Sequence, residues 1–162
     1  MQLPEEITLL GKGPSLDNFE YKIYTVGINE TAYLKKCDAA IAIDYPVLKK
    51  YIKFLKEDIL VFRKHTHISY EFKNMYLMDY NIHAPCKDLR TGTASIFIQL
   101  ASYLGVKKIY FYGFDAIKGI DGYANSIIKN NAKGENDDKY KRISKSILAA
   151  LHLTKIEPIW CF

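Results

Sequence analysis

The chain has 162 residues, enough for one domain with a substantial core, and 49% of them are hydrophobic, the ordinary share for a globular protein. No apolar run approaches the roughly 18 residues that span a bilayer, and acidic residues stand near the N-terminus where a secretory signal would carry bases, so we expect a cytoplasmic protein without a transmembrane segment. A net charge of +5, spread over scattered lysine pairs, favours an anionic small ligand over a nucleic acid, which needs a concentrated basic stripe.

Apolar runs of strand length alternate with segments of helical periodicity, the pattern of βα units around a mainly parallel sheet. The predicted strands are 7–10, 22–26, 39–43, 58–62, 74–78, 107–112 and 156–162. The predicted helices are a short one that ends near residue 36, then 45–57, 91–104 and 140–153. Outside these elements, 63–90 and 116–138 are predicted as irregular loops. The predicted fold is therefore α/β, a single Rossmann-like domain over 1–162 with helices flanking a mainly parallel sheet.

The first predicted strand breaks abruptly into Gly11, Lys12, Gly13, Pro14 and Ser15. Glycines let the backbone approach a ligand closely, and Pro14 fits the first turn of a helix because it has a fixed φ and no N–H to lose. A strand that turns into a helix N-terminus here would direct unpaired N–H groups at an anion such as phosphate. The turn matches neither of the standard nucleotide motifs, so phosphate binding and a plain strand-to-helix turn both remain open.

Polar residues also follow other predicted strands, namely Asn29, Asp44 and Asp115. In an open parallel sheet, ligands bind beyond these carboxyl ends. Asn29 suits a ribose or a base edge, or else an Asx turn. The two aspartates suit ribose hydroxyls or a metal, or else cap the next turn.

Thr91, Gly92 and Thr93 form a second turn of small residues, at the start of the clearest predicted helix. Their hydroxyl and N–H groups suit a second phosphate or the far side of a nucleotide. The alternative is an N-cap by Thr91 or Thr93.

Cysteine and histidine spacing gives little support to a metal site. Cys37, Cys86 and Cys161 are an odd number at wide spacings, which predicts reduced packing residues and neither a disulfide framework nor a zinc site. His65 and His67 are a weak metal signal and are more often loop or packing residues. We therefore predict no metal site.

The order of these pieces resembles the bacterial lipooligosaccharide sialyltransferases and the related Rossmann-like family named after 6-hydroxymethylpterin pyrophosphokinase. The segments that carry the resemblance are L-L-G-K-G-P-S-L-D at 9–17, V-G-I-N at 26–29, K-K-C-D-A-A at 35–40, R-T-G-T-A-S at 90–95 and L-G-V-K-K-I-Y-F-Y-G-F-D at 104–115. Together they cover most of the chain in order.

The sialyltransferase resemblance implies a cytidine nucleotide sugar (a CMP-sugar) as ligand and no other cofactor. Phosphates would lie near the first glycine turn, with base and ribose against the second and third strand ends. Carried onto this chain, the implied residues are Gly11, Lys12, Gly13, Asn29, Asp44 and Thr93. In that family a tyrosine of the flexible loop supports the leaving phosphate, and Tyr123 stands where it is expected.

The chain departs from the family at positions that matter for chemistry. The second phosphate-supporting tyrosine falls at Ile117, the histidine that serves as general base falls at Lys139, and the asparagine of the glycine turn is Lys12. A lysine is protonated at neutral pH and needs a large burial-driven drop in pKa before it can act as a base.

These departures leave two interpretations open. One is a glycosyltransferase that acts by direct displacement on a glycan acceptor. The other is a non-catalytic nucleotide-binding protein that senses or sequesters a phosphorylated small molecule. A diphosphokinase acting on a pterin-like substrate follows by analogy alone. The sheet edges also predict self-association, since an unprotected edge strand can pair with a second copy.

Overall fold

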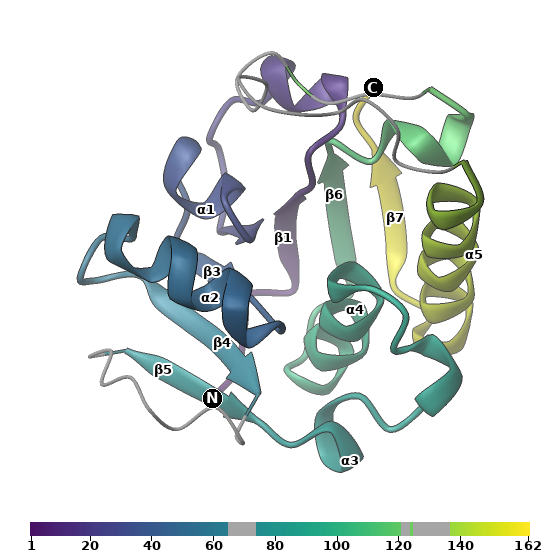
Figure 1. Cartoon of the computed structure of the whole chain (residues 1–162). Helices are drawn as coiled ribbons and strands as arrows, with labels where there is room; N and C mark the ends of the chain where they lie inside the picture. The colour runs from purple at the N-terminus through teal and green to yellow at the C-terminus, as the bar shows by residue number, and fades with distance from the viewer. Residues whose placement is uncertain (65–73, 121–123, 125–136) are drawn as a thin grey trace.

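The computed structural model describes residues 1–64, 74–120, 124 and 137–162. Its sheet has seven strands in the order β5-β4-β3-β2-β1-β6-β7, and all neighbouring strands in it are parallel. The strands are β1 (Glu6–Leu10), β2 (Thr25–Ile28), β3 (Ala39–Ile41), β4 (Leu60–Lys64), β5 (Met75–Met78), β6 (Lys108–Tyr112) and β7 (Glu157–Trp160). The predicted α/β class is confirmed, and each predicted strand is present (Figure 1).

Helices lie in several of the connections between the parallel strands. They are α1 (Thr31–Leu34), α2 (Tyr45–Tyr51), α3 (Tyr80–His83), α4 (Thr93–Tyr103) and α5 (Asp137–Thr154). Short 3₁₀ turns cover Pro14–Asn18, Ile52–Phe54, Lys87–Leu89 and Asp115–Lys118.

The prediction was wrong in two segments. The helix expected over 45–57 ends at Tyr51 and tightens into a 3₁₀ turn. The stretch 63–90, expected to be irregular beyond its strand, also holds α3, whose first turn is capped by the Asp79 carboxylate accepting from Asn81 N at 2.8 Å. A four-residue helix has too short an apolar period to be recognised in a sequence.

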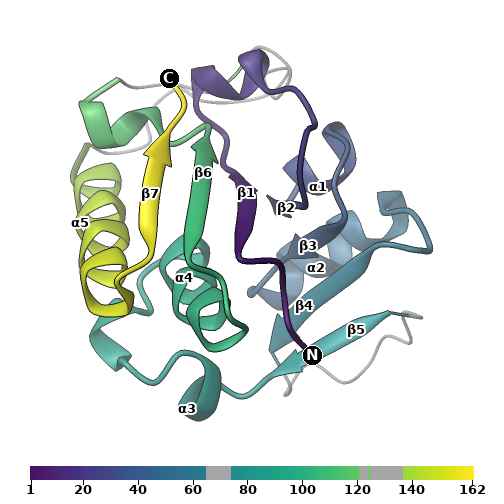
Figure 2. The same cartoon turned by 180° about the vertical axis from the view of Figure 1, so that it is seen from behind.

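Side chains of successive residues point to opposite faces of the sheet and enter two different cores. Along β3, Ala39 and Ile41 belong to the larger core, which contains the buried side chains of α4 and α5. Ala40 and Ala42 belong to a smaller core with α1 and α2. Helices therefore cover both faces of the sheet around β3 and β4, which explains why β3 has no polar side. Figure 2 views β1, β6 and β7 from the face on which no labelled helix lies over them.

Helix α4 is buried along most of its length. Every residue from Ala94 to Ala101 is buried, because α4 lies against the sheet and also contacts α5. A helix this deep has little freedom to move, so its N-terminus is held at a fixed position relative to the strand ends.

The strand order reverses at β1, which has β2 on one side and β6 on the other. The backbones that leave β1 and β6 pass very close together there. A Cβ added to Gly11 would lie 2.5 Å from the Gly113 carbonyl oxygen, and Gly113 itself has a positive φ of 78°. Glycine is therefore required at both positions for packing alone.

Candidate functional site

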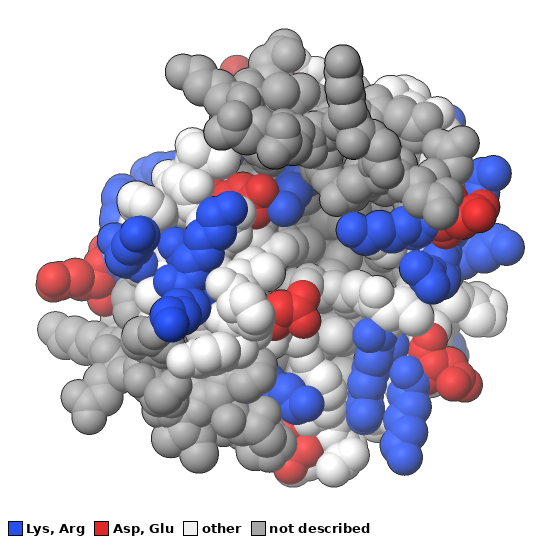
Figure 3. Space-filling model, viewed as in Figure 1, with Lys and Arg blue, Asp and Glu red and all other residues white. Residues whose placement is uncertain are grey.

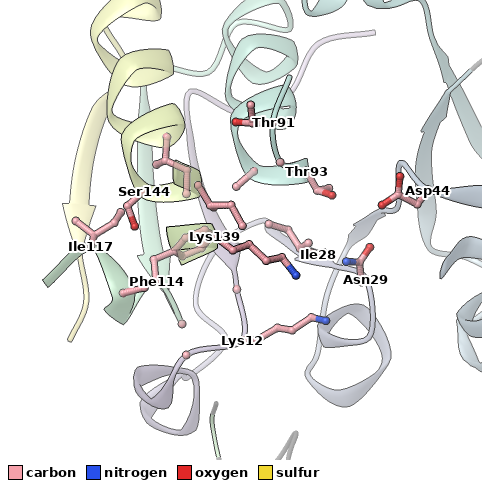
Figure 4. Close-up of a pocket in the computed structure, with 18 residues that line it drawn as sticks. Lys12, Ile28, Asn29, Asp44, Thr91, Thr93, Phe114, Ile117, Lys139 and Ser144 are labelled. Carbon is pink, nitrogen blue, oxygen red and sulfur yellow. The ribbon is translucent and has the colours of Figure 1, made fainter. Parts of the chain in front are cut away.

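A cavity of about 350 Å³ opens beyond the carboxyl ends of β1, β2 and β6, next to the first turn of α4 (Figure 4). We call it the main cavity. Its lining residues are Gly11, Lys12, Gly13, Ile28, Asn29, Asp44, Thr91, Gly92, Thr93, Ala94, Gly113, Phe114, Ala116, Ile117, Lys139, Ile143, Ser144 and Ile147. The position beside the reversal of strand order is where open α/β sheets bind ligands, and the volume is that of a small-molecule site.

The glycine turn does not form the cradle of free N–H groups that the sequence suggested. Gly11 N donates to the Tyr112 carbonyl and Gly13 N to the Gly113 carbonyl, each at 2.8 Å. Ser15 N donates to the Asp115 carboxylate at 3.1 Å. These donors are used by the neighbouring β6 turn, which the sequence places a hundred residues away. A bound anion would have to find other partners.

The turn also leads into a 3₁₀ helix of only five residues, Pro14–Asn18. So short an element has a small dipole compared with an α-helix of several turns. Pro14 does stand at its start, as predicted. Two longer helices begin at the main cavity, α4 at Thr93 and α5 at Asp137, whose first turn contributes Lys139 to the lining.

Ser15 and Asp115 do not line the main cavity but bind each other. Ser15 Oγ donates to Asp115 Oδ2 at 2.8 Å and accepts from Gly113 N at 2.8 Å. Both side chains are buried, with 4% of each residue exposed. The pair clamps the β1 turn to the β6 turn, and we therefore assign both residues a structural role.

Lys12 projects from the glycine turn, and its ammonium group is already paired. Lys12 Nζ lies 2.7 Å from Glu30 Oε1, and the Glu30 side chain is 12% exposed. The other carboxylate oxygen of Glu30 is buried and has no hydrogen-bond partner among the described residues. A phosphate bound at Lys12 would therefore compete with the Glu30 carboxylate, which has no other hydrogen-bond partner among the described residues to replace Lys12.

The charges around this face do not form one basic stripe. Figure 3 shows lysines and arginines distributed around the face, with carboxylates among them. A local field of mixed sign suits recognition of a compact ligand better than of a polyanion.

Asn29 lies at the end of β2 with a positive φ of 54°. Asparagine tolerates this left-handed conformation better than most residues. Asn29 N donates to the Ile41 carbonyl at 3.0 Å, which ties the ends of β2 and β3 together. The Asn29 side chain lines the cavity on the same side as Asp44 (Figure 4).

Thr91, Gly92 and Thr93 bring the N-terminus of α4 to the main cavity. Gly92 is the N-cap and provides no capping side chain, while Ser95 Oγ bonds back to the Gly92 carbonyl at 2.9 Å. The predicted cap by Thr91 or Thr93 was therefore wrong. The first turn of this eleven-residue helix offers N–H groups and a positive dipole end to a ligand.

Beyond Lys139 and Ile117, which the resemblance had indicated, sequence reasoning missed the side chains that form the apolar wall of the main cavity. Helix α5 contributes Lys139, Ile143 and Ile147, spaced four residues apart and thus on one helical face, with Ser144 beside them. Phe114 and Ile117 follow β6. The four-residue spacing was visible in the sequence, but a helical period does not tell whether that face of α5 borders a cavity or the core. Only the resemblance at Lys139 pointed to a site.

A second cavity of about 430 Å³ adjoins the first and shares Asp44 and Thr91–Thr93 with it. Its further lining residues are Ile43, Tyr45, Pro46, Lys64, Tyr80, Arg90 and Ile96. The Tyr80 ring lies under two cations, with Lys64 Nζ 4.8 Å and the Arg90 guanidinium carbon 5.2 Å from its centroid. Burial raises the pKa of Tyr80 to about 12, the charge of Asp44 adds to this shift, and Arg90 opposes it.

Arg90 is held in place by the loop that precedes α4. Its Nε donates to the Ala84 carbonyl at 2.8 Å and its Nη2 to the Tyr80 carbonyl at 2.9 Å. A guanidinium fixed in this way gives the second cavity a permanent positive charge.

Three residues singled out in the sequence lie beyond the part of the chain that the structure describes, namely Tyr123, His65 and His67. Within the described part of the chain, no group of three His, Cys, Asp or Glu side chains is arranged to hold a metal ion. No helix there is long and apolar enough to cross a membrane. Cytoplasmic location and self-association stay predictions.

Comparison of the sequence with protein-family models finds no match, and comparison with curated proteins finds none either. Comparison of the fold with solved structures does find neighbours. The monofunctional α-2,3-sialyltransferase Cst-I from Campylobacter jejuni superposes with a TM-score of 0.59 at 16% identity, over 99% of this chain and 78% of that chain.

The sialyltransferase CstII from the same organism, solved with the substrate analogue cytidine-5′-monophosphate, gives a TM-score of 0.53 at 19% identity, over 98% of this chain and 80% of that one. An α-2,3-sialyltransferase from Campylobacter jejuni in its apo form gives 0.55 at 15%, over 97% and 75%. The fold is therefore sialyltransferase-like. These neighbours give no support to the pterin pyrophosphokinase part of the resemblance.

Proposed function

We propose that this protein binds a cytidine nucleotide sugar in the main cavity and transfers the sugar to a hydroxyl acceptor. The observation that carries the proposal is the position of the cavity. It lies where the strand order reverses, between the ends of β1, β2 and β6 and the N-terminus of α4, in a fold shared with sialyltransferases. One of those neighbours was solved with cytidine-5′-monophosphate bound.

The phosphate of the ligand would take its charge partners from the cavity wall. Lys12 and Lys139 both line the cavity and bring positive charge from opposite ends of the chain. The first turn of α4 adds N–H donors at Thr93 and Ala94. Asn29 can hydrogen-bond a ribose or a base edge, as either donor or acceptor.

Catalysis would proceed by direct displacement at the anomeric carbon. The acceptor oxygen forms a bond to that carbon while the bond to the phosphate oxygen breaks and the nucleotide departs with the electron pair. Tyr123 would support the leaving phosphate, as the sialyltransferase resemblance implies, by donating a hydrogen bond to the growing charge.

Binding of the nucleotide can be tested by calorimetry with CMP, UMP, AMP and GMP. Lys12→Ala is expected to weaken CMP binding by roughly 10-fold to 100-fold, because a hydrogen bond to a charged group contributes about 1.5–3 kcal/mol. Glu30→Gln is expected to strengthen it, because the neutral amide releases Lys12 Nζ from its 2.7 Å ion pair. Lys22→Ala, an exposed lysine outside the cavity, is the matched control.

Transfer is tested by following release of CMP from a panel of CMP-sugars, with and without glycan acceptors. Release of CMP with formation of a glycoside supports the proposal. Binding of no nucleotide at millimolar concentration, or equal binding by Lys12→Ala and the parent protein, contradicts it.

A specific observation favours a second candidate, a nucleotide-binding protein without turnover. The described residues that line the main cavity include no histidine, and Lys139 occupies the place where the resemblance implies a base. CMP binding without release of CMP from any donor would favour this candidate.

A further inference from the structure

Asp44 lies on the boundary between the two cavities. It lines both of them, and among the described lining residues it is the one carboxylate. Thr91, Gly92 and Thr93 form the rest of the shared boundary, and none of them has a carboxylate or an imidazole. Among the residues that line both cavities, Asp44 is therefore the one whose side chain can serve as a proton acceptor for a ligand in either.

The carboxylate of Asp44 is not used to build the fold. Asp44 is the N-cap residue of α2, but its side chain forms no capping hydrogen bond, and the helix is started by the Asp44 carbonyl, which accepts from Leu48 N at 2.9 Å. The residue is exposed. Figure 4 shows its side chain at the cavity together with Asn29 and Thr93, across from Ser144 and Ile117. Its oxygens are thus available to a ligand, and a proton taken up there can pass to solvent.

The alternative base is poorly suited to the task. Lys139 lines the main cavity and is exposed. A lysine in its usual cationic form attracts a phosphate but has no lone pair with which to accept a proton. A carboxylate has lone pairs on both oxygens and can accept one.

We propose that Asp44 is the general base of sugar transfer, an inference that rests on the function proposed above. The nucleotide sugar occupies the main cavity and the acceptor enters the second cavity. Asp44 accepts the proton of the acceptor hydroxyl as the oxygen bonds to the anomeric carbon. The bond from that carbon to the phosphate oxygen breaks, and its electron pair leaves with the nucleotide.

The second cavity has the features needed to receive an acceptor. It is adjacent to the main cavity, and its wall combines the Tyr80 ring with Lys64 and Arg90. An aromatic face and fixed cations suit a sugar that also carries negative charge. A hydroxyl of such a sugar would meet Asp44 at the boundary.

The experiment compares the full chain with Asp44→Asn, Asp44→Glu and the control Asp58→Asn. Asp58 is an exposed carboxylate just before β4, at the opposite end of the strands from the cavities. Calorimetry with CMP measures binding, and CMP release from a CMP-sugar with an acidic glycan acceptor measures turnover.

Asp44→Asn is expected to bind CMP within about threefold of the parent protein. Its turnover is expected to fall by roughly 100-fold to 10,000-fold, the usual contribution of a general base. Asp44→Glu is expected to recover part of the rate, and Asp58→Asn to equal the parent. Any decline of the parent rate toward acid pH that depends on this base should be missing from the residual rate of Asp44→Asn.

Three outcomes would overturn the inference. If the parent protein turns over a donor and Asp44→Asn does so at the same rate, Asp44 is not the base, while the proposed function stands. If Asp44→Asn loses CMP binding and turnover by the same factor, Asp44 holds the nucleotide instead. If the parent binds CMP but turns over no donor with any acceptor, the inference and the transfer reaction both fail and the binding protein remains.

Discussion

The clamp between the β1 and β6 turns gives the sharpest test of how this site is built. We consider Asp115→Ala, which removes the carboxylate that accepts from Ser15 N at 3.1 Å and from Ser15 Oγ at 2.8 Å. Both partners stay buried in the variant, because Ser15 and Asp115 are each only 4% exposed. Water cannot replace the lost acceptor without opening the two turns.

The expected loss of stability follows from these contacts. Hydrogen bonds to a charged group contribute about 1.5–3 kcal/mol each, and a buried donor left without a partner costs about 1–3 kcal/mol. Two bonds to one carboxylate therefore predict a loss of about 3–5 kcal/mol in the free energy of unfolding of Asp115→Ala. That is a large fraction of the 5–15 kcal/mol typical of a whole protein. For a chain of this length, it corresponds to a fall in Tm of roughly 6–20 °C.

The measurement is urea denaturation of four proteins, namely the parent, Ser15→Ala, Asp115→Ala and the double variant. Because the two side chains act as one unit, the double variant is expected to be little less stable than Asp115→Ala. Asp58→Ala, which removes an exposed carboxylate, is expected to change the free energy by less than about 0.5 kcal/mol. CMP affinity should fall along with stability, because both clamped turns line the main cavity.

A loss below about 1 kcal/mol for Asp115→Ala would refute this reasoning. So would strictly additive effects of Ser15→Ala and Asp115→Ala. Either result would mean that the turns are held by their backbone contacts alone, and that Ser15 and Asp115 are free to serve a ligand.

Three further predictions concern single positions. Gly27→Ala is expected to lower the free energy of unfolding in urea by about 1–3 kcal/mol, because the new Cβ would lie 2.5 Å from the Ala32 backbone. Gly92→Ala, whose Cβ would lie 3.7 Å from its nearest neighbour, should lower it by less than about 1 kcal/mol, and equal losses would contradict this reasoning. Tyr80→Phe should be as stable as the parent at pH 7 or more so, since the Tyr80 hydroxyl is buried without a hydrogen-bond partner among the described residues, and a loss above 1 kcal/mol would point to a partner. Burial raises the pKa of the Cys37 thiol to about 12, so iodoacetamide should label Cys37 at pH 8 far more slowly in the folded protein than in urea, and equal rates would show that the thiol is exposed.

Tyr80 also predicts how stability depends on pH. The pKa of the Tyr80 phenol is about 12 in the folded state and near 10 in the unfolded state, so below pH 10 the phenol is neutral in both states and does not reduce stability. As the pH rises from 10 to 12 the unfolded state loses this proton first, and the free energy of unfolding falls. Tyr80→Phe should therefore lose less stability than the parent across this range.

The order of elements was predictable because local patterns carry it. Seven apolar runs with turn residues between them predicted seven strands, and the four-residue period of α4 and α5 predicted both helices. The positions of Asn29 and Asp44 at the cavity followed as well, since residues after parallel strands must lie at one edge of the sheet.

The role of each residue at that edge was decided by contacts across long stretches of chain. The pattern at Gly11–Ser15 is the same whether its N–H groups face a ligand or the β6 turn, and only the fold brings Gly113 and Asp115 against them. The Lys12–Glu30 ion pair depends in the same way on the fold. Hydrophobic periodicity is a local property that the sequence determines by itself, whereas the partners of a polar group depend on which distant segments meet, and that is settled by tertiary packing.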